Sequence, residues 1–390
     1  MSKLRLFALG AAGLALSAGL NAQQDLPFNV TEVAQLQEPW AMAFMPDGRL
    51  LVTERAGTLK LVDVTDGSAI DIAGVPAVAY GSQSGFGEVA LHPDYADNGW
   101  IYFSYSEDVD GRNSTLTVFR AKLALSGDSG RLTDLETLWR QSPPSGGGQY
   151  GMRIAFGGGY MWISVGDRMR EDPAQDLQQT IGKIVRLNYD GSVPADNPFA
   201  DQGGVAAEVW TLGHRNQYGL AFDAQGRLWS NEMGPRGGDE LNLIERGRNY
   251  GWPEVSNGTE YSGAPIPDHD TRPEFRAPVV YWVPSISPSS LIFYEGDEFP
   301  EWKGNAFVGA LSGNAIIRVA IEGDTGREVE RFPVGRVRGL AEGADGAIWV
   351  ILDGGGAGGR GRGGGFGRGG GRGGAPAAGP PGSLLKLTAD

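Results

Sequence analysis

The chain has 390 residues and 41% apolar side chains, which is enough for one large domain or two smaller ones. Its formal net charge of -14 argues against a nucleic-acid-binding protein, because neutralising phosphate groups requires a concentrated basic surface. The sequence contains no cysteine, which excludes disulfides and lipid attachment at a thiol.

Residues 1–22 predict a secretory signal peptide. Lys3 and Arg5 precede an apolar stretch from Leu6 to Leu20, and a small-residue cleavage pattern ends at Ala22. A membrane anchor is the alternative, but glycines and a serine interrupt the apolar stretch. No second stretch approaches the roughly 18 apolar residues that a membrane span needs. We therefore expect a mature chain without a membrane span, located in the periplasm or secreted.

One hairpin pattern recurs along the rest of the chain. A short apolar segment leads into a turn with Asp or Gly and then into an alternating segment with an aromatic residue. Asp47-Gly48 and Asp345-Gly346 are turns of the kind that join two paired strands. The copies lie at residues 41–54, 86–105, 152–165, 219–229, 290–308 and 339–350. Six copies predict an all-β, six-bladed β-propeller over residues 23–390, each copy being the inner part of a four-stranded blade. A two-sheet sandwich is the alternative, but it gives no reason for six repeats.

Two features concern the end of the chain. Residues 29–34 are expected to pair with residues 383–388, which would close the ring and cover both edges. Residues 354–382 are almost entirely Gly, Arg, Ala and Pro. We interpret them as a disordered loop inserted between the third and fourth strands of the last blade. An RNA-binding arginine-glycine tract is the alternative, which export from the cytoplasm disfavours.

Polar residues gather just outside the predicted strands, where propeller loops converge over the central channel. Arg215, Asn216, Arg336 and Arg338 suit a planar anion with several carboxylates, because guanidinium groups bind carboxylates in a bidentate manner. Salt bridges between blades are an equally open interpretation of these arginines. The Gly234-Pro235 carbonyls and the Glu240–Tyr250 stretch contain the hard oxygen ligands that calcium prefers.

Several longer motifs resemble the soluble PQQ-dependent glucose/sorbosone dehydrogenases, and most of all the aldose sugar dehydrogenases. They are Gly213-His-Arg-Asn216, the Asn231–Leu243 stretch, Asn249-Tyr-Gly-Trp-Pro253, the Gly182–Gly191 stretch and Asp196-Asn-Pro-Phe199. The resemblance extends from about Pro39 to Thr388. It implies a six-bladed propeller that oxidises an aldose at C1, transferring a hydride to PQQ bound together with Ca²⁺.

The resemblance also implies roles for individual residues. PQQ contacts are expected at Arg215, Asn216, Tyr261, Trp282, Arg336 and Arg338. The carbonyls of Gly234 and Pro235 would hold the cofactor's calcium, and Glu240 and Tyr250 would bind a structural calcium. Gln83 matches a substrate-contacting glutamine, and Asp167 matches the carboxylate that orients the family's catalytic histidine.

Two positions depart from the family pattern. Gln149 stands where the family has the histidine that removes the sugar hydroxyl proton, and an amide accepts no proton at neutral pH. Ser312 stands where a lysine is expected to contact PQQ. The residues leave open an active dehydrogenase with Asp167 as a replacement base, a PQQ-binding propeller without catalysis, and a calcium-dependent lactonase. The sugar and the electron acceptor are not indicated.

Overall fold

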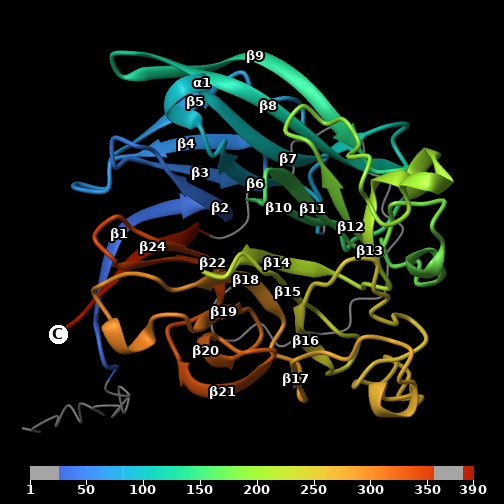
Figure 1. Ribbon diagram of the computed structural model, residues 1–390. Helices are drawn as coiled ribbons and strands as arrows, with labels where there is room; N and C mark the ends of the chain where they lie inside the picture. Colours follow the sequence, from blue (N-terminus) through green and yellow to red (C-terminus); the bar gives the residue numbers. More distant parts are fainter. Residues whose placement is uncertain (1–25, 82, 355–380) are drawn as a thin grey trace, which may run out of the picture.

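The computed structural model describes residues 26–81, 83–354 and 381–390. The predicted signal peptide at residues 1–22 and most of the predicted loop at residues 354–382 lie outside these residues. The described part is almost entirely β-structure, arranged as six four-stranded blades (Figure 1). No helix in the described part is long and apolar enough to cross a membrane.

The first three blades follow one another along the chain. The first contains β2 (Pro39–Phe44), β3 (Leu50–Glu54), β4 (Thr58–Val62) and β5 (Ala69–Ala73). The second contains β6 (Phe86–Leu91), β7 (Trp100–Asp108), β8 (Ser114–Ser126) and β9 (Ser129–Arg140), with helix α1 (Tyr95–Asn98) between β6 and β7. The third contains β10 (Gly151–Gly157), β11 (Tyr160–Val165), β12 (Lys183–Leu187) and β13 (Val209–Leu212). The first two blades form one eight-stranded sheet, because β5 and β9 pair in parallel at their outer edges.

The last three blades complete the ring. The fourth contains β14 (Gln217–Phe222), β15 (Leu228–Glu232), β16 (Asp239–Leu243) and β17 (Val280–Trp282). The fifth contains β18 (Pro288–Phe293), β19 (Ala306–Ala310), β20 (Ala315–Glu322) and β21 (Thr325–Phe332). The sixth contains β22 (Val337–Glu342), β23 (Ile348–Leu352), β24 (Pro381–Thr388) and β1 (Asn29–Gln37). Short 3₁₀ helices lie in the loops at Asp172–Gln175, Ala200–Gln202, Gly204–Glu208, His269–Thr271 and Pro300–Trp302.

The repeated hairpins are confirmed as the two inner strands of each blade. The copy at residues 41–54, for example, forms β2 and β3, and its turn places Gly48 at a φ of 87°. That left-handed backbone favours glycine, as the Asp-Gly pattern predicted. Antiparallel pairs of the same kind form at β6–β7, β10–β11, β14–β15, β18–β19 and β22–β23. The six-bladed propeller is therefore confirmed.

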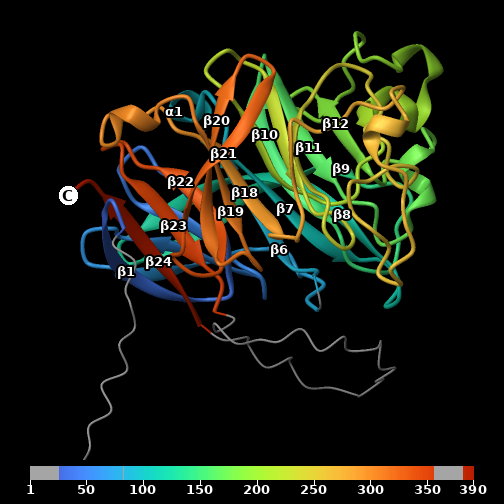
Figure 2. The ribbon, with the colours of Figure 1, turned by 90° about the horizontal axis from the view of Figure 1, so that it is seen from below.

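Ring closure is also confirmed, whereas the position of the Gly/Arg-rich loop needs a correction. Strand β1 pairs antiparallel with β24, Asn29 opposite Thr388, and both views show the two strands together (Figures 1 and 2). The loop leaves the sixth blade after β23 and returns at β24, so it joins the second and third strands, not the third and fourth. The prediction was wrong because β1 supplies the outermost strand of this blade. Pro381 and Gly382, placed in the loop by the sequence, already belong to β24.

Candidate functional site

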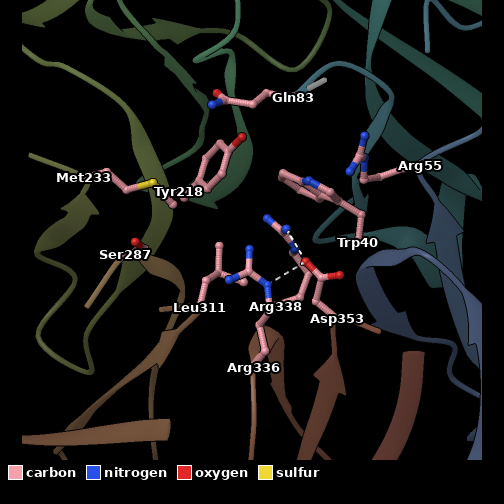
Figure 3. A pocket seen from close by; sticks show the side chains of 10 residues that line it. All are labelled: Trp40, Arg55, Gln83, Tyr218, Met233, Ser287, Leu311, Arg336, Arg338 and Asp353. Atoms are coloured by element: carbon pink, nitrogen blue, oxygen red, sulfur yellow. Dashed lines mark hydrogen bonds and ion pairs between the residues drawn. The ribbon is translucent and has the colours of Figure 1, made fainter. Parts of the chain in front are cut away.

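A pocket of about 260 Å³ lies where loops from several blades converge (Figure 3). Its lining residues come from the first, fourth, fifth and sixth blades and from the loop that enters the second. They are Trp40, Arg55, Gln83, Tyr218, Met233, Ser287, Leu311, Arg336, Arg338 and Asp353. We call this cavity the axial pocket. It contains three of the predicted site residues, namely Gln83, Arg336 and Arg338.

The axial pocket carries excess positive charge. Arg336 Nε and Arg338 Nη2 both donate to Asp353 Oδ2, at 3.3 and 2.6 Å. Burial opposes ionisation of Asp353, but the two guanidinium groups hold its pKa below the ordinary value. One carboxylate therefore pairs with two arginines, whereas Arg55, which lines the same cavity, pairs with Glu38 at 3.4 Å. The rings of Trp40 and Tyr218 meet edge to face at 6.0 Å beside these groups (Figure 3). Flat apolar walls next to guanidinium groups suit a planar anion.

Arg215 lies behind this pocket and is separated from it by Met233. Its Nη1 donates to the carbonyls of Met233 and Gly234, at 2.9 and 2.7 Å, and its Nη2 donates to the Tyr261 hydroxyl at 3.0 Å. Met233 lines both the axial pocket and a smaller cavity that Arg215 lines with Gly234. Arg215, in the loop before β14, thus approaches the same region as Arg336 and Arg338 but does not line the axial pocket.

Gln149 connects the predicted catalytic residues. Its backbone N–H donates to Gln83 Oε1 at 2.7 Å, which ties it to the wall of the axial pocket. In the amide orientation that satisfies both neighbours, the side-chain nitrogen donates to Asp167 Oδ1 and the oxygen accepts from Arg215 Nη2 at 2.9 Å. Gln149 is buried and has a left-handed φ of 53°. A non-glycine residue in this conformation is held there by its surroundings.

Asp167 is a buried carboxylate behind Gln149. It accepts from Trp252 Nε1 and from the backbone N–H of Met169, both at 2.8 Å. Burial raises the pKa of Asp167 from 3.8 to about 6, although the Arg215 charge opposes this rise. Asp167 is therefore mostly ionised at neutral pH, yet it takes up a proton more readily than an exposed aspartate.

This shift predicts a pH-dependent effect of Asp167→Asn on stability. Because the folded pKa of about 6 exceeds the unfolded value, the folded chain gains stability by binding a proton at low pH and loses that gain as pH rises through 6. The buried charge then costs about 2–3 kcal/mol above pH 7. The free energy of unfolding of the variant minus that of wild type, measured in urea, should therefore be about 2 kcal/mol larger at pH 7.5 than at pH 4.5. The same difference at both pH values would contradict the assignment.

Three other predicted cofactor contacts lie outside the axial pocket. Asn216 is buried beside Met233, and its Oδ1 accepts from the Gly151 backbone at 3.3 Å. Ser312 lies next to the pocket, where its hydroxyl lies 2.8 Å from the Ser287 hydroxyl. Trp282 is packed in the core around Leu241 and Ile286 and donates to Glu328 Oε2 at 2.7 Å. The indole of this outer-strand residue thus faces the neighbouring blade, and a contact of Trp282 with PQQ stays a prediction.

The predicted structural calcium ligands surround a buried negative charge. Glu240 lies beside Glu232, and the Asn242 amide donates to both carboxylates at 2.9 and 3.0 Å. Burial and the Glu232 charge raise the pKa of Glu240 well above its ordinary value. His269 Nε2 donates to the Tyr250 carbonyl at 3.1 Å and lies 4.0 Å from Glu240 Oε1. A cation fits these groups chemically, since it would relieve the repulsion between the carboxylates.

The described part of the chain contains no cluster of three or more His, Cys, Asp or Glu side chains that could hold a metal ion. A calcium ion near Glu240 would therefore need backbone oxygens for most of its ligands. At the expected cofactor-calcium position, the Gly234 carbonyl already accepts from Arg215. An ion there would have to use the second lone pair of that oxygen.

Sequence reasoning missed several pocket residues that share one position in the repeat. Arg55, Met233, Leu311 and Asp353 each directly follow the second strand of a blade. The repeat could have revealed them, because equivalent positions in different blades face the same axis. Their charge and size differ from blade to blade, so no residue-level motif identifies them.

Fold and site define a class: a six-bladed propeller with an arginine-lined axial pocket suited to a planar anion. Comparison of the sequence with known proteins supports this class. Residues 36–359 match the family model described as Glucose / Sorbosone dehydrogenase. The chain is 39% identical to an aldose sugar dehydrogenase of Escherichia coli over 330 residues, which are 82% of this chain and 88% of that protein. The chain therefore belongs to the glucose/sorbosone dehydrogenase family.

Two solved structures are similar over nearly the whole chain. The soluble aldose sugar dehydrogenase from Escherichia coli, in its apo form, superposes with a TM-score of 0.81 at 35% identity, covering 93% of this chain and 100% of that one. The PQQ-bound aldose sugar dehydrogenase from Streptomyces coelicolor gives a TM-score of 0.68 at 26% identity, covering 92% and 98%.

Proposed function

We propose that this chain binds PQQ in the axial pocket and oxidises an aldose at C1 to a lactone. The observation that carries this proposal is the convergence of Arg336 and Arg338 on one cavity, where among the described residues a single carboxylate, that of Asp353, pairs with both. The positive charge of such a site can balance the negative charge of an anion with several carboxylates. An arginine-rich lining argues against the lactonase alternative, which needs carboxylates at the centre of the channel.

In the proposed reaction, different residues of the axial pocket bind PQQ and the sugar. Arg336 and Arg338 bind carboxylates, and Trp40 and Tyr218 provide flat walls. Bound PQQ would supply a two-electron acceptor for the hydride that leaves C1. Gln83 lies at the pocket wall, which supports the inference that it contacts the sugar. The hydroxyl proton of the sugar needs an acceptor, and Gln149 supplies none.

Asp167 is the carboxylate proposed to accept this proton. Its raised pKa suits a general base near neutral pH. The Gln149 amide, however, lies between Asp167 and Arg215 and hydrogen-bonds to both. Proton transfer to Asp167 therefore requires a water or a movement of Gln149. We infer slow turnover compared with a family member that has a histidine at this position.

The same amide favours a second candidate, a PQQ-binding propeller without catalysis. Gln149 satisfies Asp167 and Arg215 together, which produces a stable site with no free base. To distinguish the candidates, the purified chain would be loaded with PQQ and Ca²⁺ and assayed for dye reduction with a panel of aldoses. Turnover with any aldose supports the dehydrogenase. Binding of PQQ without turnover supports the second candidate, and no binding rejects both.

Calcium near Glu240 is expected to stabilise the chain. A ligand that binds only the folded state adds about 2.7 kcal/mol at a concentration of 100 times its Kd. Adding Ca²⁺ to chelator-treated protein should therefore raise the melting temperature, and Glu240→Gln should remove most of this increase. An equal increase in the variant would place the ion elsewhere, and no increase in wild type would contradict the structural calcium.

We also propose that the chain acts outside the cytoplasm as one propeller domain. The basic and apolar pattern of residues 1–22 supports export. Mass spectrometry of the protein expressed in a bacterial host should find a mature chain beginning near residue 23 in the periplasm or medium. An uncleaved chain in the cytoplasm would contradict this proposal.

A further inference from the structure

Arg168 is a buried cation that the proposed reaction does not use. It follows Asp167 in the loop after β11 and is 1% exposed. Among the described residues, no carboxylate oxygen lies within ion-pair distance of its guanidinium group. The charge is instead surrounded by backbone carbonyls and by the Tyr150 ring, whose centroid lies 3.6 Å from the guanidinium carbon. Burying a charge in this manner requires many well-placed acceptors.

These acceptors belong mainly to the loop that leads into Gln149. Nε donates to the Gly148 carbonyl at 3.1 Å, and Nη2 donates to the carbonyls of Ser145 and Gly147 at 2.9 and 3.2 Å. Nη1 donates to Gln141 Oε1 at 3.0 Å, at the end of the second blade. The Arg168 guanidinium group thus fixes the position of residues 141–148, which connect the second blade to the third.

The backbone around Arg168 also reaches residue 149. The Arg168 N–H donates to the Gln149 carbonyl at 3.2 Å, and the Asp167 N–H donates to the Arg215 carbonyl at 2.7 Å. A Cβ on Gly166 would lie 2.1 Å from the Gln149 carbonyl oxygen, so only glycine permits this approach. Residues 166–168, directly after β11, and the loop before β10 therefore pack together as one unit.

Left-handed backbone is concentrated in this unit and in the residues next to it. Gln149, Met152, Arg168, Met169 and Glu171 all have a φ between 53° and 76°. Non-glycine residues keep such conformations only where surrounding contacts enforce them. The multiple donors of Arg168 supply such contacts for the segment that contains Gln149.

We propose that Arg168 is a positioning residue that holds residue 149 against Asp167 and Gln83. Arg168 touches no lining residue of the axial pocket by any described hydrogen bond, so it acts through the loop. Its effect on turnover rests on the proposed function, whereas its effect on the loop does not. A lysine keeps the charge, but its three donors cannot replace the five N–H donors of a planar guanidinium group.

The test compares Arg168→Lys with Arg186→Lys in the full chain without cofactor. Arg186 is a matched control, because it is also buried in the third blade and stacks on the Tyr160 ring at 4.2 Å, but belongs to β12 and lies away from the axial pocket. Hydrogen exchange takes place in the full chain and is then measured on the proteolytic fragment that covers residues 145–152. We expect exchange of the Gln149 and Gly151 amides to be about 10-fold faster in Arg168→Lys and unchanged in Arg186→Lys. Equal protection in both variants would overturn the proposal.

A second readout uses the Gln149→His background. There Arg168→Lys should lower kcat about 10- to 100-fold with little change in KM, because a misplaced base loses rate while sugar contacts remain. An unchanged kcat would count against the positioning role. If Gln149→His shows no turnover, the proposed function fails, and the exchange measurement still decides the role of Arg168. If Arg168→Lys does not fold, Gln141→Met removes one acceptor and should give the same local increase in exchange.

Discussion

Gln149→His is expected to raise kcat for aldose oxidation by about 100- to 10,000-fold, the usual contribution of a general base. In the present chain the side chain at this position donates to Asp167 and accepts from Arg215. A histidine there can donate one ring N–H to Asp167 and keep the other nitrogen free to accept the C1 hydroxyl proton. Asp167 would then orient the base instead of replacing it.

The measurement is steady-state dye reduction by the PQQ- and Ca²⁺-loaded protein at several pH values. Gln149→Asn is the matched control, because it keeps an amide and changes only its reach. It should not gain activity. PQQ affinity should be similar in all three proteins, which separates chemistry from binding. Wild-type turnover equal to that of the histidine variant would show that Gln149 does not limit the reaction and that the base lies elsewhere.

Arg153→Met is expected to lower the free energy of unfolding by about 3–5 kcal/mol, as removal of one partner from a buried ion pair commonly does. Arg153 on β10 lies at the centre of the ring. It contacts the innermost strand of each of the other five blades, at Trp40, Glu88, Tyr218, Ser289 and Arg338. Its Nη1 donates to Glu88 Oε2 at 2.9 Å. Burial raises the pKa of Glu88, and Arg153 opposes this rise, so the variant leaves a buried and uncompensated acid.

Urea unfolding monitored by tryptophan fluorescence checks this prediction, and the double variant Arg153→Met/Glu88→Leu is its control. Replacing both partners removes the unpaired charge, so the double variant should recover much of the lost stability. A double variant as unstable as Arg153→Met would show that contacts other than the ion pair determine the loss. Three of the Arg153 partners, Trp40, Tyr218 and Arg338, also line the axial pocket. PQQ affinity should therefore fall in Arg153→Met.

Most of the fold was predictable from the sequence because most of its signals are local. Each inner hairpin has its own period-two pattern and turn, as the Asp47-Gly48 turn between β2 and β3 illustrates. Pairing of β1 with β24 followed from two alternating segments at opposite ends of the chain. The strand order within the last blade was mispredicted, because the composition of the Gly/Arg-rich segment does not reveal which strands it joins.

The site was predicted less completely, because its geometry depends on how the blades are arranged. Of the residues expected at the site, Arg336, Arg338 and Gln83 line the axial pocket, whereas Trp282 packs in the core. Arg153 was not recognised as a central residue, since its five partners are far apart in the sequence. The role of Arg168 also depends on a loop from the preceding blade. Contacts between segments that are far apart in the sequence cannot be predicted from the residue spacing within one segment.

Calorimetric titration with PQQ, with and without Ca²⁺, tests the central claim most directly. Wild type should bind one PQQ, and Arg338→Gln should bind it about 10- to 100-fold more weakly, as expected for the loss of one hydrogen bond between charged groups. Lys60→Gln, which changes a surface charge paired with Asp71 on the first blade, should bind like wild type. Absence of binding in wild type, or equal affinity in Arg338→Gln, would contradict a quinone site built on these guanidinium groups.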